Sequence, residues 1–137
     1  MARAKRENHV SKQLHMRVHH GKPIFPHSVS VEGKRMIMCS GQLAWDTHGS
    51  IVGKNDMRAQ LRQVCENLAE ALSIAGASWD DVVKTNTFTT DVDELLKHAD
   101  VRQEYFGRAW PTSTTVEVRK LAHPDMLVEI EVVAVVD

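Results

Sequence analysis

The sequence predicts a single α+β domain whose two helices cover only one face of its β-sheet. Three observations lead to this prediction. With 137 residues, the chain has the commonest size of one domain and can bury one sizeable core. Its apolar residues follow the order strand, strand, helix, strand, helix, strand, strand, and each helix has one apolar side. The last strand has one wholly apolar side and three large apolar residues on its other side, so the sheet face that the helices leave open needs another cover.

The composition is typical of a globular protein and excludes several classes of function. Hydrophobic residues make up 42% and charged residues 26% of the chain, and the formal net charge is −1. No field of one sign would therefore gather the phosphates of a nucleic acid. No signal peptide and no apolar run of about 20 residues is apparent, so we expect a cytoplasmic protein without a membrane span. In that compartment Cys39 and Cys65 are expected as buried thiols, with a disulfide as the alternative.

Residues 1–22 form a polar, basic segment without a usable period, and we expect this segment to be flexible. The domain itself is then 23–137. The basic side chains could contact an anionic partner, but a solvated tail is the simpler interpretation. Histidines occur here at His15, His19 and His20 without a cysteine or carboxylate cluster, so no metal site is predicted.

Two strands are predicted at the start of the domain, where regular structure begins near Pro26. Residues 28–32 alternate between polar and apolar, and 36–39 form a short apolar run. Gly33-Lys34 lies between them and supplies a turn. The pattern predicts a β-hairpin with one well-buried strand.

The first helix is the clearest predicted element. Asn55 or Asp56 can cap its N-terminus, and Gly76 can end it. Its apolar residues recur at steps of three and four and therefore share one side: Met57, Leu61, Val64, Cys65, Leu68, Leu72 and Ala75.

The second half of the chain predicts a strand, a helix and two further strands. The helix is expected from a cap at Asp91 or Asp93 to about Phe106, with Gly107 able to end it. Its apolar side is expected at Val92, Leu95, Leu96, Ala99, Gln103 and Phe106. The strands are expected at 82–89, 114–118 and 127–136, from their content of Val, Thr and other β-favouring residues.

The last strand combines a wholly apolar side with a mixed one. The apolar side suits the helices: Val128, Ile130, Val132, Ala134 and Val136. The other side carries Leu127, Glu129, Glu131, Val133 and Val135. This mixture favours a subunit interface with a polar pocket over a half-exposed strand. A carboxylate at Glu129 or Glu131 would then be partly desolvated and suited to acid–base catalysis, while a surface salt bridge is the alternative interpretation.

Four motifs, in this order and spacing, resemble the RidA/YjgF family of reactive-intermediate and enamine/imine deaminases. The resemblance extends from about Pro26 to Val136. The motifs are Ile37-Met38-Cys39-Ser40-Gly41-Gln42, then Gly76 with Val82-Val83-Lys84-Thr85, then Pro111-Thr112-Ser113-Thr114-Thr115-Val116-Glu117-Val118, and the ending Val128-Glu129-Ile130-Glu131-Val132.

The resemblance implies a fold, an assembly and an activity. The fold is like that of trimeric chorismate mutase, with a mixed sheet and two helices on one face. Three subunits pack their open faces together as a homotrimer, with ligand pockets in the clefts between neighbours. Family enzymes hydrolyse 2-imino acids or their enamine tautomers to 2-oxo acids and ammonia, with no metal or organic cofactor.

The resemblance also implies roles for individual residues. Glu129 falls on the glutamate that orients the attacking water. The substrate would be bound by His27, Ser40, Gly41, Ser113 and Thr115. Of these, His27 stands where the family has tyrosine and Thr115 where many members have cysteine. A helix asparagine of the family falls on or near Ala99.

This chain departs from the family at Ser113, where the family has an arginine that grips the substrate carboxylate. Serine has no charge and cannot form the bidentate pair that arginine forms. Arg108, Arg119 and His27 are candidates for a replacement cation, and His27 is the best placed of these. Two functions follow: a deaminase-like hydrolase of a small reactive nitrogen compound, or a trimer that binds a small metabolite without catalysis.

Overall fold

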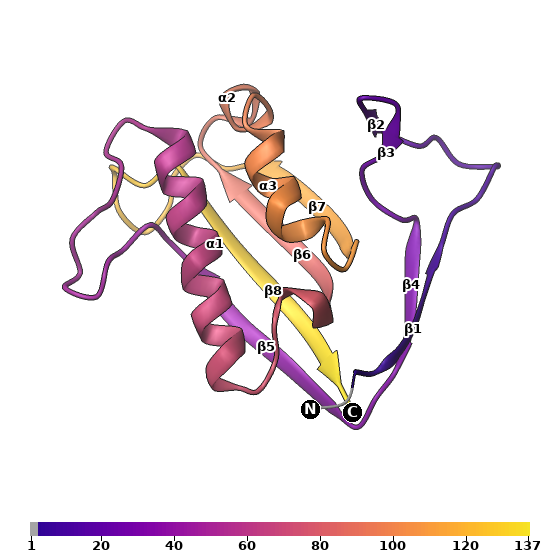
Figure 1. The fold of residues 1–137 in the computed structure, drawn as a ribbon. Helices are drawn as coiled ribbons and strands as arrows, with labels where there is room; N and C mark the ends of the chain where they lie inside the picture. Colours follow the sequence, from indigo (N-terminus) through magenta and orange to yellow (C-terminus); the bar gives the residue numbers. More distant parts are fainter. Residues whose placement is uncertain (1–2) are drawn as a thin grey trace.

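The computed structural model describes residues 3–137 and centres on one mixed β-sheet with helices on one side (Figure 1). Four strands form this sheet in the order β5-β8-β6-β7. They are β5 (Arg35–Gln42), β6 (Val82–Thr89), β7 (Thr112–Glu117) and β8 (Val128–Val136). β6 and β7 are parallel, whereas β8 is antiparallel to both β5 and β6. The predicted α+β class, with helices on one face of the sheet, is thereby confirmed.

Helix α1 (Met57–Ile74) forms where the sequence predicts the first helix. The Asp56 side chain accepts a hydrogen bond from the backbone N–H of Ala59 at 3.1 Å and so caps the N-terminus. Gly76 has a φ of +83° just beyond the C-terminus, a conformation that glycine adopts without steric cost. The predicted apolar side packs onto β5 and β8.

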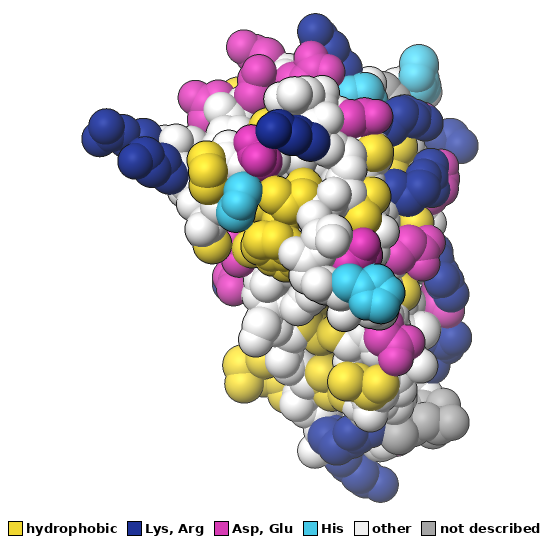
Figure 2. Space-filling view, turned by 90° about the vertical axis from the view of Figure 1, so that its left-hand side faces the viewer, with side chains coloured by type: hydrophobic (Ala, Val, Ile, Leu, Met, Phe, Trp, Pro, Cys, Tyr) yellow, Lys and Arg dark blue, Asp and Glu magenta, His cyan; other side chains and the backbone are white. Residues whose placement is uncertain are grey.

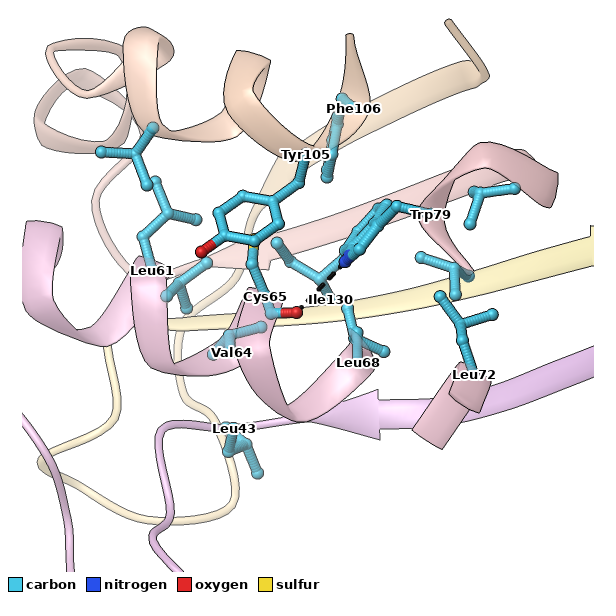
Figure 3. Close-up of a cluster of buried hydrophobic side chains, with 14 of the residues drawn as sticks. Leu43, Leu61, Val64, Cys65, Leu68, Leu72, Trp79, Tyr105, Phe106 and Ile130 are labelled. Carbon is cyan, nitrogen blue, oxygen red and sulfur yellow. Dashed lines mark hydrogen bonds between the residues drawn. The ribbon is translucent and has the colours of Figure 1, made fainter. Parts of the chain in front are cut away.

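The hydrophobic core lies between the helices on one side and the sheet on the other (Figure 3). Trp79 is almost fully buried in a one-turn helix (Trp79–Asp81) and donates from its indole nitrogen to the Cys65 carbonyl at 3.2 Å. Its ring packs against the rings of Tyr105 and Phe106. Both cysteines are free thiols, and Cys65 is buried whereas Cys39 is only half-buried.

The predicted second helix is divided into α2 (Val92–Leu96) and α3 (Ala99–Phe106). Asp91 caps α2 by accepting from the backbone N–H of Glu94 at 3.0 Å. In a continuous helix, Leu95 and Val101 would be separated by about 600° of rotation and would face about 120° apart. Both side chains are fully buried. The break between the two helices therefore allows both to enter the core.

The predicted hairpin at the start of the domain is wrong, although both of its strands form. β4 (Ser28–Glu32) pairs with β1 (Lys5–His9), in a two-stranded ribbon that leaves the main sheet (Figure 1). β5 pairs with β8 instead. The chain crosses the end of β8 at Gly33, where a Cβ would overlap atoms of Ala4 and Val135. Alternation along a strand shows which side chains share a face, but not which strand is the partner.

The expectation that regular structure begins near Pro26 is also wrong. Besides β1, two short strands, β2 (Val18–His19) and β3 (Lys22–Pro23), pair at the tip of the ribbon (Figure 1). Asn8 of β1 donates to the Trp110 carbonyl at 2.9 Å, and the Trp110 indole donates to the Ile24 carbonyl at 3.0 Å. These bonds attach the ribbon to the turn before β7, a contact between distant segments that local sequence patterns do not reveal.

The two sides of β8 differ as predicted. The side toward the helices is buried: Val128, Ile130, Val132, Ala134 and Val136. The opposite side carries Glu129, Glu131 and Val133, all partly exposed, and Val135. On the neighbouring strand β5, Met36 and Met38 are 63% and 75% exposed on the same open face. Within the described residues 3–137, no helix is long and apolar enough to cross a membrane.

Candidate functional site

Glu129 lies on the open face of the sheet, at a point where the backbone of β5 approaches it closely. Cys39 pairs with Val132 and Gln42 pairs with Ile130, so β5 contains one extra residue in this interval. The resulting bulge brings Gly41 against the Glu129 side chain, and a Cβ on Gly41 would overlap the carboxylate oxygen Oε1. Gly41 and Glu129, both candidate site residues, thus lie close together, and a side chain at position 41 would displace the carboxylate.

The carboxylate of Glu129 has no polar partner among residues 3–137. It lines a shallow pocket together with Phe88, Lys120 and Leu121, and no hydrogen bond or ion pair to another described side chain forms there. Burial, and to a smaller extent the negative charge of Glu131, raises the pKa of Glu129 above its usual value. A carboxylate whose pKa is raised toward neutrality is a better proton acceptor and donor near pH 7.

The neighbouring carboxylate, Glu131, is in a different situation. It accepts a hydrogen bond from the side-chain amide of Asn86 on β6 at 3.0 Å. This bond fixes the orientation of Glu131 and satisfies one of its oxygens. Of the two carboxylates that the sequence analysis considers, Glu129 is therefore the one left available to a ligand or a water molecule.

Ser113 and Thr115 lie on the other face of the sheet, toward the helices. They pair in register with Thr85 and Thr87 of β6, both of which are fully buried on that face. The Arg102 guanidinium of α3 lies beside them. Its Nη2 donates to Thr115 Oγ1 at 3.0 Å and lies 3.5 Å from Ser113 Oγ.

Arg102 is a site residue that the sequence analysis does not predict. It is only 6% exposed. The signal is present in the sequence: Arg102 stands three residues after Ala99 and four before Phe106, so it shares their apolar side of the helix. An arginine on the buried side of a helix is unusual, because charged side chains are rarely buried without a partner.

The remaining predicted site residues lie apart from these two groups. His27 lies in the N-terminal ribbon, where Nδ1 accepts from the Ser11 backbone N–H at 2.9 Å and Nε2 lies 3.1 Å from the His15 carbonyl oxygen. Both ring nitrogens of His27 are thus engaged within the N-terminal segment, and no hydrogen bond joins His27 to Ser113 among the described residues. Ser40 is exposed on the open face.

The other two candidate cations are also not placed to replace a charge at Ser113. Arg108 forms a two-point ion pair with Asp80, with N–O distances of 3.1 and 2.9 Å. Arg119 is exposed beyond the C-terminal end of β7. The guanidinium that lies beside Ser113 belongs to Arg102.

The structure thus divides the predicted site into two parts on opposite faces of the sheet. Glu129 pairs with Phe88 of β6, which pairs with Val116 of β7. Thr115 is one residue from Val116, so its Cα lies about 10 Å from that of Glu129 across two strand spacings. Because the side chains point to opposite faces, one protomer cannot present both to the same ligand.

Comparisons with known proteins agree with the fold and the motifs. The sequence profile of the family described as "Endoribonuclease L-PSP" matches residues 19–136. A RutC family protein from Pyrococcus horikoshii is 36% identical over 113 residues, which cover 82% of this chain and 89% of that protein.

Solved structures agree as well. A member of the conserved Rid protein family, YyfB from Yersinia pestis, superposes with a TM-score of 0.82 at 30% identity, covering 96% of this chain and 98% of that one. Escherichia coli TdcF, solved with bound serine, gives a TM-score of 0.68 at 30% identity, covering 79% and 88%. The chain belongs to the endoribonuclease L-PSP family, which is the RidA/YjgF family that its sequence motifs resemble.

Proposed function

We propose that this protein is a cytoplasmic, cofactor-independent hydrolase of enamine or imine C–N bonds, acting as a homotrimer with Glu129 as the group that activates water. The observation that carries the proposal is the Glu129 carboxylate, partly buried, free of partners among residues 3–137 and held against the Gly41 backbone. A carboxylate in this state can orient a water molecule and accept its proton.

The chemistry requires only proton transfer and addition of water. Starting from the protonated imine, Glu129 accepts a proton as the water oxygen bonds to the imine carbon, and the C=N electron pair moves to nitrogen. Glu129 then returns this proton to the amine of the resulting carbinolamine. The C–N bond breaks as the hydroxyl oxygen forms the C=O bond, and the hydroxyl proton passes back to Glu129. The products are a carbonyl compound and ammonia. The raised pKa of Glu129 suits both the acceptance and the return of the proton.

Assembly as a trimer is supported by the open face of the sheet. Met36 and Met38 expose their side chains there opposite Val135 and Val133 of β8, and an apolar strip of this kind is typical of an interface. Association would also bring Glu129 of one subunit toward the Ser113–Thr115 edge of another. The family resemblance implies the same arrangement.

The surface supports a small-molecule substrate rather than a nucleic acid. On the face shown in Figure 2, Lys and Arg side chains are interspersed with Asp and Glu side chains, with apolar side chains between them. The formal net charge is −1. A nucleic-acid site would require a continuous basic patch to neutralise phosphates.

The proposal is tested by ammonia release from imines generated in situ from a panel of amino acids by an amino acid oxidase. Glu129→Gln removes the proton acceptor while keeping the shape, and we expect turnover to fall by about 10²- to 10⁴-fold. Glu131→Gln is the matched control on the same strand face and should retain most of the activity. Equal turnover by Glu129→Gln and the unaltered protein would refute the assigned role.

A second function, binding of a small metabolite without catalysis, is favoured by the uncharged Ser113. TdcF, the relative solved with bound serine, indicates that this fold accommodates an amino acid. If no imine of the panel is hydrolysed faster than in buffer while small metabolites bind stoichiometrically, the binding function replaces the catalytic one.

A further inference from the structure

Arg102 carries a buried charge without a counter-ion. Its side chain extends from α3 and lies over the ring of Phe106, with the guanidinium carbon 5.1 Å from the ring centroid. Only Nη2 donates to a described residue, and Nε is buried without a hydrogen-bond partner. No ion pair joins Arg102 to a carboxylate within residues 3–137.

The absence of a counter-ion is costly, because a buried charge needs compensating partners. Burial, with a smaller effect of the nearby Arg17 charge, lowers the pKa of Arg102 to about 10, although Cys65 acts in the opposite direction. The side chain therefore remains protonated at neutral pH. Cys65 does not act as the counter-ion, since burial raises its own pKa to about 12 and keeps it a neutral thiol.

Arg102 and Arg17 line the same cleft, between the N-terminal ribbon and α2, α3 and β7. The cleft is small, with a volume of about 40 Å³, and it is open to solvent at its mouth. Its walls are mostly apolar, formed by Ile24, Phe25, Leu96 and Phe106. Two cations, one of them buried, thus face one apolar cleft that contains no Asp or Glu among its described lining residues.

We propose that Arg102 binds the carboxylate group of a small ligand whose apolar part lies in this cleft. The guanidinium supplies N–H groups that match a carboxylate, and Thr115 fixes its orientation. The apolar walls favour a monoanion with a short hydrocarbon chain over inorganic phosphate, which would need donors on every side. The inference rests on the proposed function only in taking this edge of the sheet as part of the ligand site.

Binding of butyrate and 2-oxobutyrate, measured by calorimetry, tests the proposal. We expect Arg102→Met to bind both about 10- to 100-fold more weakly, which is the usual loss for one charge-assisted hydrogen-bonded contact. Arg58→Met is the matched control, because Arg58 is an exposed arginine that pairs with Asp100 on the surface. Its binding should be unchanged. Butyramide, the neutral analogue, should not discriminate between unaltered and Arg102→Met protein.

A stability measurement separates ligand binding from a structural role. Met replaces the unbranched apolar part of the Arg side chain and carries no charge, so Arg102→Met should leave the thermal midpoint unchanged or raise it. A lowered midpoint, or dissociation of the oligomer without ligand, would show that Arg102 is a structural residue or pairs with a neighbouring subunit. Either result overturns the proposal, as does unchanged carboxylate binding by Arg102→Met.

A variant that moves the arginine to another position in the same cleft provides a second test, in which binding is expected to be regained. The double variant Arg102→Met/Ser113→Arg moves the guanidinium from α3 to the adjoining strand, and we expect it to recover carboxylate binding relative to Arg102→Met. Arg102→Lys retains the charge but loses the paired geometry, and should bind at an intermediate level. If Arg102→Met does not fold, Arg102→Lys is compared with Arg58→Lys, and equal binding by these two overturns the proposal.

Failure of this inference can be distinguished from failure of the proposed hydrolase. Butyrate contains no C–N bond, so its binding does not depend on turnover. Arg102-dependent binding without hydrolysis of any imine would support the carboxylate site and refute the hydrolase. If imines are hydrolysed equally fast by Arg102→Met and the unaltered protein, and no carboxylate binds, the hydrolase is supported and the carboxylate site is refuted.

Discussion

The two faces of the central sheet differ in the charge that each leaves without a partner. On the open face, the Glu129 carboxylate lies beside Gly41, and no cation among the described residues pairs with it. On the covered face, the Arg102 guanidinium lies at the β7 edge, and no carboxylate in the described part of the chain pairs with it. Each charged group has lost part of its hydration without gaining a partner of opposite charge, which costs free energy. The two groups have opposite charges. The comparison shows that opposite charges without partners lie on opposite faces of the same sheet, and both proposals above depend on this arrangement.

The largest expected effect contrasts the two sides of strand β8. Ile130 is fully buried on the covered side, so Ile130→Ala should lower the free energy of unfolding by about 2–5 kcal/mol. Val133→Ala on the open side is the matched control and should cost less than about 1.5 kcal/mol. Denaturant titration of both variants measures the two losses in the free energy of unfolding. Equal costs would mean that the open face is as well packed as the core, and would weaken the contrast between the faces.

A smaller effect tests the contact that positions Glu129. A methyl group at Gly41 would overlap the carboxylate, so Gly41→Ala should displace it and lower turnover by about 100-fold, equivalent to about 2.7 kcal/mol. Stability should change little, because the flexible end of a side chain can move away.

The control is the same substitution in the Glu129→Gln background. There the carboxylate is already inactive, so Gly41→Ala should cause little further loss of turnover. Additive losses would show that Gly41 affects catalysis by a route other than Glu129.

The smallest expected effect concerns pH. Because burial and Glu131 raise the pKa of Glu129 in the folded protein, folding favours the protonated form. Its stabilising contribution is fully present below the unfolded pKa and is lost as the pH rises through the folded pKa. Glu129→Gln should therefore have a higher thermal midpoint than the unaltered protein at pH 7, and the difference should diminish toward pH 4. Thermal melts across this range measure it, and a constant difference would contradict the raised pKa.

The raised pKa of Glu129 also predicts how turnover depends on pH. The rate should decrease on the acid side as Glu129 becomes protonated. Glu131→Gln removes the like charge and should move this acid limb to lower pH. An acid limb that does not move would mean that burial alone raises the pKa of Glu129.

Much of the fold could be predicted because it depends on local periodicity. The side-chain period of helix α1, its Asp56 cap and its end near Gly76 are all properties of neighbouring residues. The alternation along β8 likewise indicates which residues enter the core. Glu129 and Gly41 could be singled out as candidate site residues because they belong to motifs, and the structure places them close together.

Other features could not be predicted because they depend on contacts between distant segments. β4 pairs with β1 rather than with β5, and β5 pairs with β8. Such pairings depend on which strand edges the whole fold brings together. The break between α2 and α3 allows Leu95 and Val101 to be buried together. Ser113 indicated that a charge was missing, but not that α3 supplies one nearby.

The sequence by itself determined the fold class and the family, and it singled out Glu129 on the last strand as a candidate, because these follow from local periods and from motifs. Only the tertiary structure decided where the guanidinium of Arg102 lies and what surrounds each of the two charges. A guanidinium reaches several ångströms from its backbone, so the environment of Arg102 depends on how α3 packs over β7 and on how the N-terminal ribbon closes the cleft. That packing places an arginine beside Ser113 without an arginine at position 113.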